Sequence, residues 1–209
     1  MGFASNVFIN CPFDEAYRPI LHPILFCVLQ LGFEPRIATE SADSGKSRID
    51  KIVALVGECR FGVHDLSRMS AVAAGELYRL NMPLELGLGI GCRRFGAGQL
   101  ADKRCLILEK EHFRYQAAIS DLAGSDIRSH GDNPERACGE VRSWLVIEAG
   151  LRRPVASTTI WGRFNRFVAD LYDELAVDGY SPEEFKQLPV PELLPRMRDW
   201  IASNPAGRP

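Results

Sequence analysis

The chain has 209 residues, of which 46% are hydrophobic and 25% are charged, a balance typical of globular proteins. Its formal net charge of -2 provides no broad positive field that would attract nucleic acid or an anionic membrane. No apolar run approaches the roughly 18 residues needed to span a bilayer, and the first residues lack a signal peptide, so we expect a cytoplasmic protein with neither nucleic-acid nor membrane partners.

Strand and helix patterns alternate along the first 150 residues. The first strand is predicted at 6–13, and the helix that follows has apolar positions from Ile20 to Leu29 and ends at Gly32. The remaining strands are predicted at 33–40, 60–68 and 103–110, and the remaining helices at 49–57, 82–95 and 135–149. Residues 69–80 fit either a loop or a mobile helix, and 112–133 are irregular and polar.

This fourfold alternation predicts an α/β fold, with an open parallel sheet covered by helices on both faces. The flavodoxin-like strand order is one solution among several. We assign residues 1–150 to this domain.

The pattern changes near Leu151, so residues 151–209 are predicted to form a helical C-terminal extension with two helical segments between 158 and 203. Its aromatic stripe, which includes Phe164 and Phe167, fits packing against the helices of the sheet. The alternative is a surface for a homo-oligomer or a partner protein.

Two stretches resemble nucleotide-binding motifs but lack a required glycine or the required spacing. SGKS resembles the end of a phosphate-binding loop, but Glu40 stands where that loop requires glycine. GLGIG lacks the GxGxxG spacing and follows the start of a helix. The six cysteines occur singly, without a CxxC pair or zinc-ligand spacing, so we expect free thiols and no metal.

In an open parallel sheet, ligands bind at the carboxyl ends of the strands. The candidate residues at this edge are Asn10, Pro12, Phe13, Arg36, Arg48, His64, Asp65, Asn81 and Glu85. This mixture of acids, arginines and an aromatic side chain indicates a small-molecule site. His64 and Asp65 are adjacent, so they point to opposite faces of their strand, and we expect Asp65 to face the site.

Glu85 is a lone carboxylate in the predicted first turn of a helix that continues with Gly87, Gly89 and Gly91. A simple helix cap would explain the carboxylate alone. Each glycine costs about 0.8–1.0 kcal/mol relative to alanine within a helix, so three of them suggest close approach to the sheet or a ligand. A tightly seated helix would direct Glu85 into the crevice.

Three stretches in this order, FINCPFD, DLS and NMPLELGLGIG, resemble the nucleoside 2-deoxyribosyltransferases and their relatives, the Toll/interleukin-receptor (TIR) domains. The matching positions are Cys11-Pro12-Phe13, Asp65 and Glu85-Leu86-Gly87, within residues 6–110. Residues 69–80 are an insertion relative to the deoxyribosyltransferases, expected to act as a lid or specificity loop.

The resemblance implies cleavage of an N-glycosidic bond, with NAD or a nucleotide as substrate and no resident cofactor. Glu85 would stabilise or capture the oxocarbenium ion, kept ionised by the helix N-terminus, while Asp65 would orient the ribose hydroxyls or the nucleophile. Phe13 would stack on the base, and Arg48 or Arg36 would bind phosphate. Similar TIR-like enzymes serve in bacterial antiviral defence once assembled.

Two alternatives remain open. The first is a nucleoside 2-deoxyribosyltransferase or nucleotide N-hydrolase, and the second is a non-catalytic sensor of a nucleotide signal. Zinc-hydrolase and serine-hydrolase functions are disfavoured because neither HExxH nor GxSxG occurs.

Overall fold

The computed structural model describes residues 2–40, 43–69, 71 and 79–206. Five parallel strands form one sheet in the order β2-β1-β3-β4-β5. The strands are β1 (Asn6–Asn10), β2 (Glu34–Arg36), β3 (Phe61–Asp65), β4 (Arg104–Glu109) and β5 (Arg128–Ser129). This is the flavodoxin-like order, so the prediction of an open parallel α/β sheet is confirmed.

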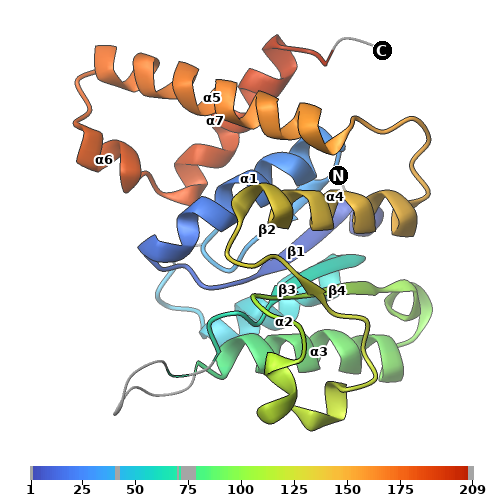
Figure 1. Ribbon diagram of the computed structural model, residues 1–209. Helices are drawn as coiled ribbons and strands as arrows, with labels where there is room; N and C mark the ends of the chain where they lie inside the picture. Colours follow the sequence, from blue (N-terminus) through green and yellow to red (C-terminus); the bar gives the residue numbers. More distant parts are fainter. Residues whose placement is uncertain (1, 41–42, 70, 72–78, 207–209) are drawn as a thin grey trace.

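Helices cover both faces of the sheet, and further helices follow at the C-terminus (Figure 1). One face packs against α1 (Arg18–Gln30) and α4 (Pro134–Ala149), and the other against α2 (Arg48–Glu58) and α3 (Asn81–Phe95). The C-terminal helices are α5 (Ser157–Val177), α6 (Pro182–Lys186) and α7 (Val190–Ser203). Short 3-10 helices occur at Phe3–Ser5, Glu15–Tyr17, Gly98–Asp102, Arg114–Ala117 and Ser120–Leu122.

The strands are shorter than the sequence predicts. β2 has only three residues because Pro35 lacks an N–H for the ladder, which suits the edge position that β2 occupies. The segment 112–133, predicted to be irregular throughout, contains β5, whose two residues are too few to produce a detectable alternation. Helix α1 continues through Pro23 and ends at Gln30, two residues before Gly32, where φ is +85°.

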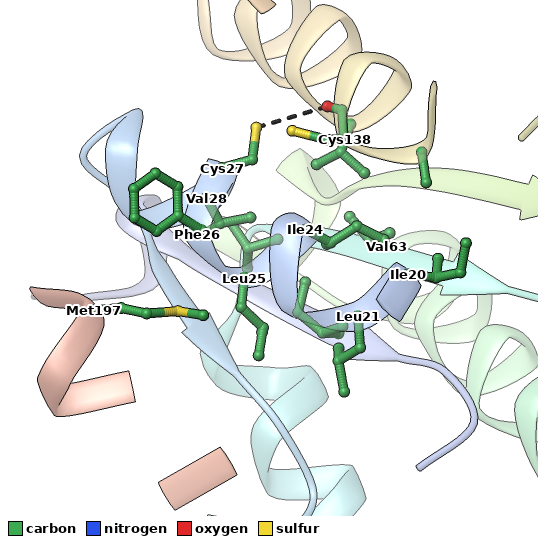
Figure 2. Close-up of a cluster of buried hydrophobic side chains, with 14 of the residues drawn as sticks. Ile20, Leu21, Ile24, Leu25, Phe26, Cys27, Val28, Val63, Cys138 and Met197 are labelled. Atoms are coloured by element: carbon green, nitrogen blue, oxygen red, sulfur yellow. Dashed lines mark hydrogen bonds between the residues drawn. The ribbon is translucent and has the colours of Figure 1, made fainter. Parts of the chain in front are cut away.

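The main core lies between the sheet and α1. Figure 2 shows apolar side chains along α1, including Leu21, Leu25 and Phe26, each at most 1% exposed. On the side facing α4, the Cys27 thiol donates to the backbone carbonyl of Cys138 at 3.7 Å. Because α1 is buried on nearly every side, it needs a further layer of protein outside it.

The C-terminal helices form that layer. Phe164, Phe167 and Trp200 place their ring centroids 5.6 to 5.8 Å from the ring of Phe26. Phe164 and Phe167 are buried, and α5 and α7 both contact α1. The aromatic stripe therefore packs against the helices of the sheet, which is the first of the two alternatives given by the sequence.

Residues 70 and 72–78 of the insertion lie outside the described residues, so its predicted role as a lid remains a prediction. The two ends of the insertion meet, since the Arg79 amide donates to the Met69 carbonyl at 2.9 Å. Among the described residues, no helix combines the length and apolarity needed to cross a membrane.

Candidate functional site

A cavity of about 450 Å³ opens where the chain leaves β1 and where α3 begins. It is lined by Asn10, Cys11, Pro12, Phe13, Arg48, Arg79, Leu80, Asn81, Met82 and Glu85. In this strand order the connections from β1 and β3 leave in opposite directions, which is where open α/β sheets bind ligands. The structure thus gathers Asn10, Pro12, Phe13, Arg48, Asn81 and Glu85 around one space.

Glu85 is 5% exposed, and its carboxylate forms no hydrogen bond or ion pair with another described residue. Burial raises the pKa of its carboxyl to about 7, and the positive charge of Arg48 opposes part of that rise. Around neutral pH the side chain therefore populates both its protonated and its ionised forms.

The sequence places Glu85 in the first turn of its helix, but α3 begins at Asn81 and Glu85 is its fifth residue. The helix dipole acts mainly over the first turn, so it contributes little here. The expectation that the helix N-terminus keeps Glu85 ionised is wrong, because desolvation dominates the pKa of this carboxyl.

Asn10 fixes the start of α3 to the end of β1. Its side-chain amide donates to the Met82 carbonyl at 2.8 Å and lies 2.9 Å from His64 Nδ1. All three residues are buried. Asn10 therefore orients the turn of α3 that carries Glu85, a positioning role that the sequence did not suggest.

The two candidate arginines are in different places. Arg48 is exposed at the N-terminus of α2, lines the cavity and forms no ion pair with another described residue. Arg36 lies outside this cavity, where it pairs with Glu40 at 2.9 Å and Glu58 at 3.1 Å. Of the two, Arg48 is the cation available to a ligand beside Glu85.

Arg79 is a lining residue that the sequence pattern does not indicate. Its guanidinium forms an ion pair with Asp14, which belongs to the segment following Phe13. Asp14 also accepts a hydrogen bond from the Tyr17 amide at 3.0 Å. A lone arginine beside an ambiguous segment gives no sequence signal for this placement.

Asp65 does not line the cavity that contains Glu85. Its carboxylate is 1% exposed and accepts hydrogen bonds from the Tyr17 hydroxyl and from the Ser67 amide at 2.8 Å. His130 Nε2 lies 3.1 Å from Asp65 Oδ2. Hydrogen bonds and the nearby imidazole outweigh burial and lower the pKa of Asp65, whereas burial and Asp65 raise the pKa of Tyr17.

The tautomer of His130 follows from its second contact. Its Nδ1 accepts from the Asp132 amide at 3.1 Å, which assigns the ring proton to Nε2, the nitrogen that lies within ion-pair distance of Asp65. The Asp65 network thus joins three segments, those after β1, β3 and β5. The sequence could not indicate it, since Tyr17 and His130 are distant from Asp65 along the chain.

His64 and Asp65 do point to opposite faces of β3. However, the residue on the face nearer to Glu85 is His64 and not Asp65. His64 lies against Asn10 and α3, whereas Asp65 shares the α1 face with Val63. Burial, with a smaller effect of Lys103, lowers the pKa of His64 to about 3. His64 is therefore neutral and serves as a structural hydrogen-bond partner.

The glycines of α3 do not share one cause. A Cβ at Gly89 would lie 3.6 Å from His64 Nε2, an ordinary contact, and a Cβ at Gly87 or Gly91 would meet nothing within 4 Å. The tight position is in β3, where a Cβ at Gly62 would lie 2.7 Å from His64 Nε2. Close approach to the sheet therefore does not explain Gly87 and Gly91, and the alternative of close approach to a ligand stays a prediction.

Cys11 lies among the site carboxylates and lines the cavity. Burial raises the pKa of its thiol well above the ordinary value, and Asp65 and then Glu85 raise it further. A protonated, buried thiol is a poor nucleophile. In the part of the chain that the structure describes, no cluster of three or more ligating side chains could hold a metal ion.

Comparisons with models of protein families, with curated proteins and with solved structures find no match to this chain. The conclusions about its function therefore rest on the geometry of the cavity around Glu85.

Proposed function

We propose that the chain cleaves the N-glycosidic bond of NAD or of a related nucleotide, with Glu85 as the carboxylate that faces the anomeric carbon. The observation that carries the proposal is a buried carboxylate without a protein partner in the described chain, on the wall of a cavity that also contains Phe13 and Arg48. A buried titratable group with a perturbed pKa inside a cavity is a typical sign of a functional site.

The lining residues fit the parts of such a substrate. Phe13 offers an apolar ring for a base, and Asn81 offers amide hydrogen bonds for hydroxyl groups. Arg48, which forms no ion pair with another described residue, offers its guanidinium to phosphate. Arg79 adds a second guanidinium, although Asp14 already balances its charge.

The raised pKa of Glu85 favours NAD over an uncharged nucleoside. The nicotinamide ring of NAD carries a positive charge, which would draw Glu85 into its ionised form on binding. As the bond from C1′ to the ring nitrogen breaks, its electron pair neutralises the ring and positive charge develops on the ribose. Glu85 would stabilise or capture that cation, and water would then add hydroxide to C1′ and release a proton.

The test is to incubate the purified protein with NAD, nucleoside monophosphates or deoxynucleosides and to follow released base by chromatography. We expect base release by the wild type and at least about a hundredfold loss in Glu85→Gln, with substrate binding nearly unchanged. Glu111→Gln, at an exposed glutamate outside the cavity, serves as the matched control. Wild-type protein that releases no base from any of these compounds contradicts the proposal.

A nucleotide sensor is the second candidate, and the same pKa supports it. A carboxyl that is largely protonated below pH 7 can recognise a ligand by donating a hydrogen bond without taking part in chemistry. In that case wild type and Glu85→Gln would both bind the nucleotide and neither would release base. Exchange of the base when a second free base is added would instead identify a deoxyribosyltransferase.

A further inference from the structure

A second cavity, of about 430 Å³, lies on the other side of α1 from the sheet, under the C-terminal helices. Its volume falls within the roughly 300–1,000 Å³ range of small-molecule sites. Figure 1 shows α6 beside the start of α1, with α5 passing over both. The apolar wall includes Phe164, Phe167 and Val168 of α5, Phe185 of α6 and Met197 of α7.

The polar side chains of this cavity come mainly from α1 and from the segment just before it. Arg18 and Glu15 line it together with Lys186 at the end of α6. The Arg18 guanidinium donates to the Lys186 backbone carbonyl, which holds α6 over the start of α1. Lys186 pairs with Glu183 at 3.5 Å, so Arg18 is the cation of this cavity that forms no ion pair with another described residue.

His22 adds an unpartnered polar group to the wall. Its Nε2 is buried and has no hydrogen-bond partner among the residues that the structure describes. Burial, assisted by the charge of Arg18, lowers the pKa of His22 to about 4, so the ring is neutral near pH 7. A neutral imidazole nitrogen without a partner is costly in an apolar wall unless a bound molecule supplies the partner.

From these features we infer that the cavity under α5 and α6 binds a small apolar carboxylate, such as a medium-chain acyl acid. The apolar body would lie against the aromatic and aliphatic wall. The carboxylate would lie near the guanidinium of Arg18, whose charge it would balance, and would reach His22. The site shares no lining residue with the Glu85 cavity and does not depend on the proposed N-glycosidase activity.

The probe is decanoate, used below its micelle concentration and compared with decylammonium, which has the same chain and the opposite charge. We expect decanoate to raise the midpoint of thermal unfolding of the full chain, since a ligand that binds only the folded state stabilises it. Decylammonium should give a much smaller shift. Equal shifts with the two probes would overturn the assignment of a carboxylate.

Two variants locate the site. Val168→Trp places a bulky ring in the cavity and should abolish the decanoate shift, whereas Val177→Trp, at an 88% exposed position on the same helix, should keep it. Arg18→Gln removes the cation from the cavity and keeps the apolar wall, so it should weaken decanoate binding roughly two- to fivefold in calorimetry. No decanoate shift in the wild type, or an undiminished shift in a folded Val168→Trp protein, would overturn the inference.

Discussion

At the scale of single residues, two carboxylates at the same edge of the sheet have opposite surroundings. Asp65 accepts hydrogen bonds from the Tyr17 hydroxyl and the Ser67 amide and lies 3.1 Å from His130 Nε2, so burial does not prevent its ionisation. Glu85 has no such donors among the described residues, so burial favours its protonated form. The same edge therefore holds one fixed negative charge and one carboxyl that changes its charge near neutral pH.

The pKa of Glu85 has a consequence for stability. Between its ordinary value of 4.5 and about 7, the folded chain keeps a proton that the unfolded chain has lost, so this residue lowers stability as pH rises through that window. Glu85→Gln lacks the charge. We expect the difference in melting temperature, variant minus wild type, to increase between pH 4.5 and pH 7. Calorimetry in matched buffers measures this difference. A difference that is constant with pH would show that the pKa of Glu85 is the same in the folded and the unfolded chain.

The hydroxyl of Tyr17 belongs to the buried Asp65 network, and its removal should be costly. A hydrogen bond to a charged group contributes about 1.5–3 kcal/mol, so Tyr17→Phe should lower the free energy of unfolding by that amount in urea titrations. Tyr180→Phe, at a partly exposed tyrosine, is the control and should change it by less than about 0.5 kcal/mol. If Tyr17→Phe behaves like the control, the hydroxyl does not bind the Asp65 carboxylate in solution.

At the scale of elements, α3 contains more glycines than its packing against the described residues requires. Gly87 and Gly91 have open space where a Cβ would be, so alanine at either position should stabilise the chain by about 0.8–1.0 kcal/mol. Gly62→Ala in β3 should destabilise it by about 1–3 kcal/mol, because the new methyl group displaces the His64 ring that contacts Asn10. Chemical denaturation of the three variants checks these signs, and destabilisation by alanine at both helix positions would refute the account of α3.

At the scale of the whole molecule, the C-terminal helices complete the core of the sheet domain. Phe26 on α1 is fully buried, and its ring packs against the rings of Phe164, Phe167 and Trp200. A chain that ends at Gly150 would expose this face of α1. Apolar burial is the dominant favourable term in folding, and net stability is only about 5–15 kcal/mol.

We therefore expect the chain ending at Gly150 to lose cooperative thermal unfolding in circular dichroism, whereas the full chain keeps it. In the full chain, Phe26→Ala should cost about 3–5 kcal/mol. Exposed Phe95 provides the control, since Phe95→Ala removes a side chain that is 92% exposed. A truncated chain that melts cooperatively at the temperature of the full chain would show that residues 1–150 fold independently.

The sequence by itself determined the elements and their order, because strand and helix periods depend on near neighbours along the chain. It also indicated which segments reach the ligand-binding edge, since parallel strands all end there. Segments without a regular period were not predictable in this way: β5 is too short, and Pro35 reduced β2 to three residues.

Only the tertiary structure decided which side chains meet. Alternation places His64 and Asp65 on opposite faces but does not say which face α3 covers, and that choice set Asp65 apart from Glu85. The start of α3 at Asn81 moved Glu85 beyond the first turn, so desolvation and not the helix dipole governs its charge. Both outcomes depend on packing between residues far apart in sequence, which local patterns do not record.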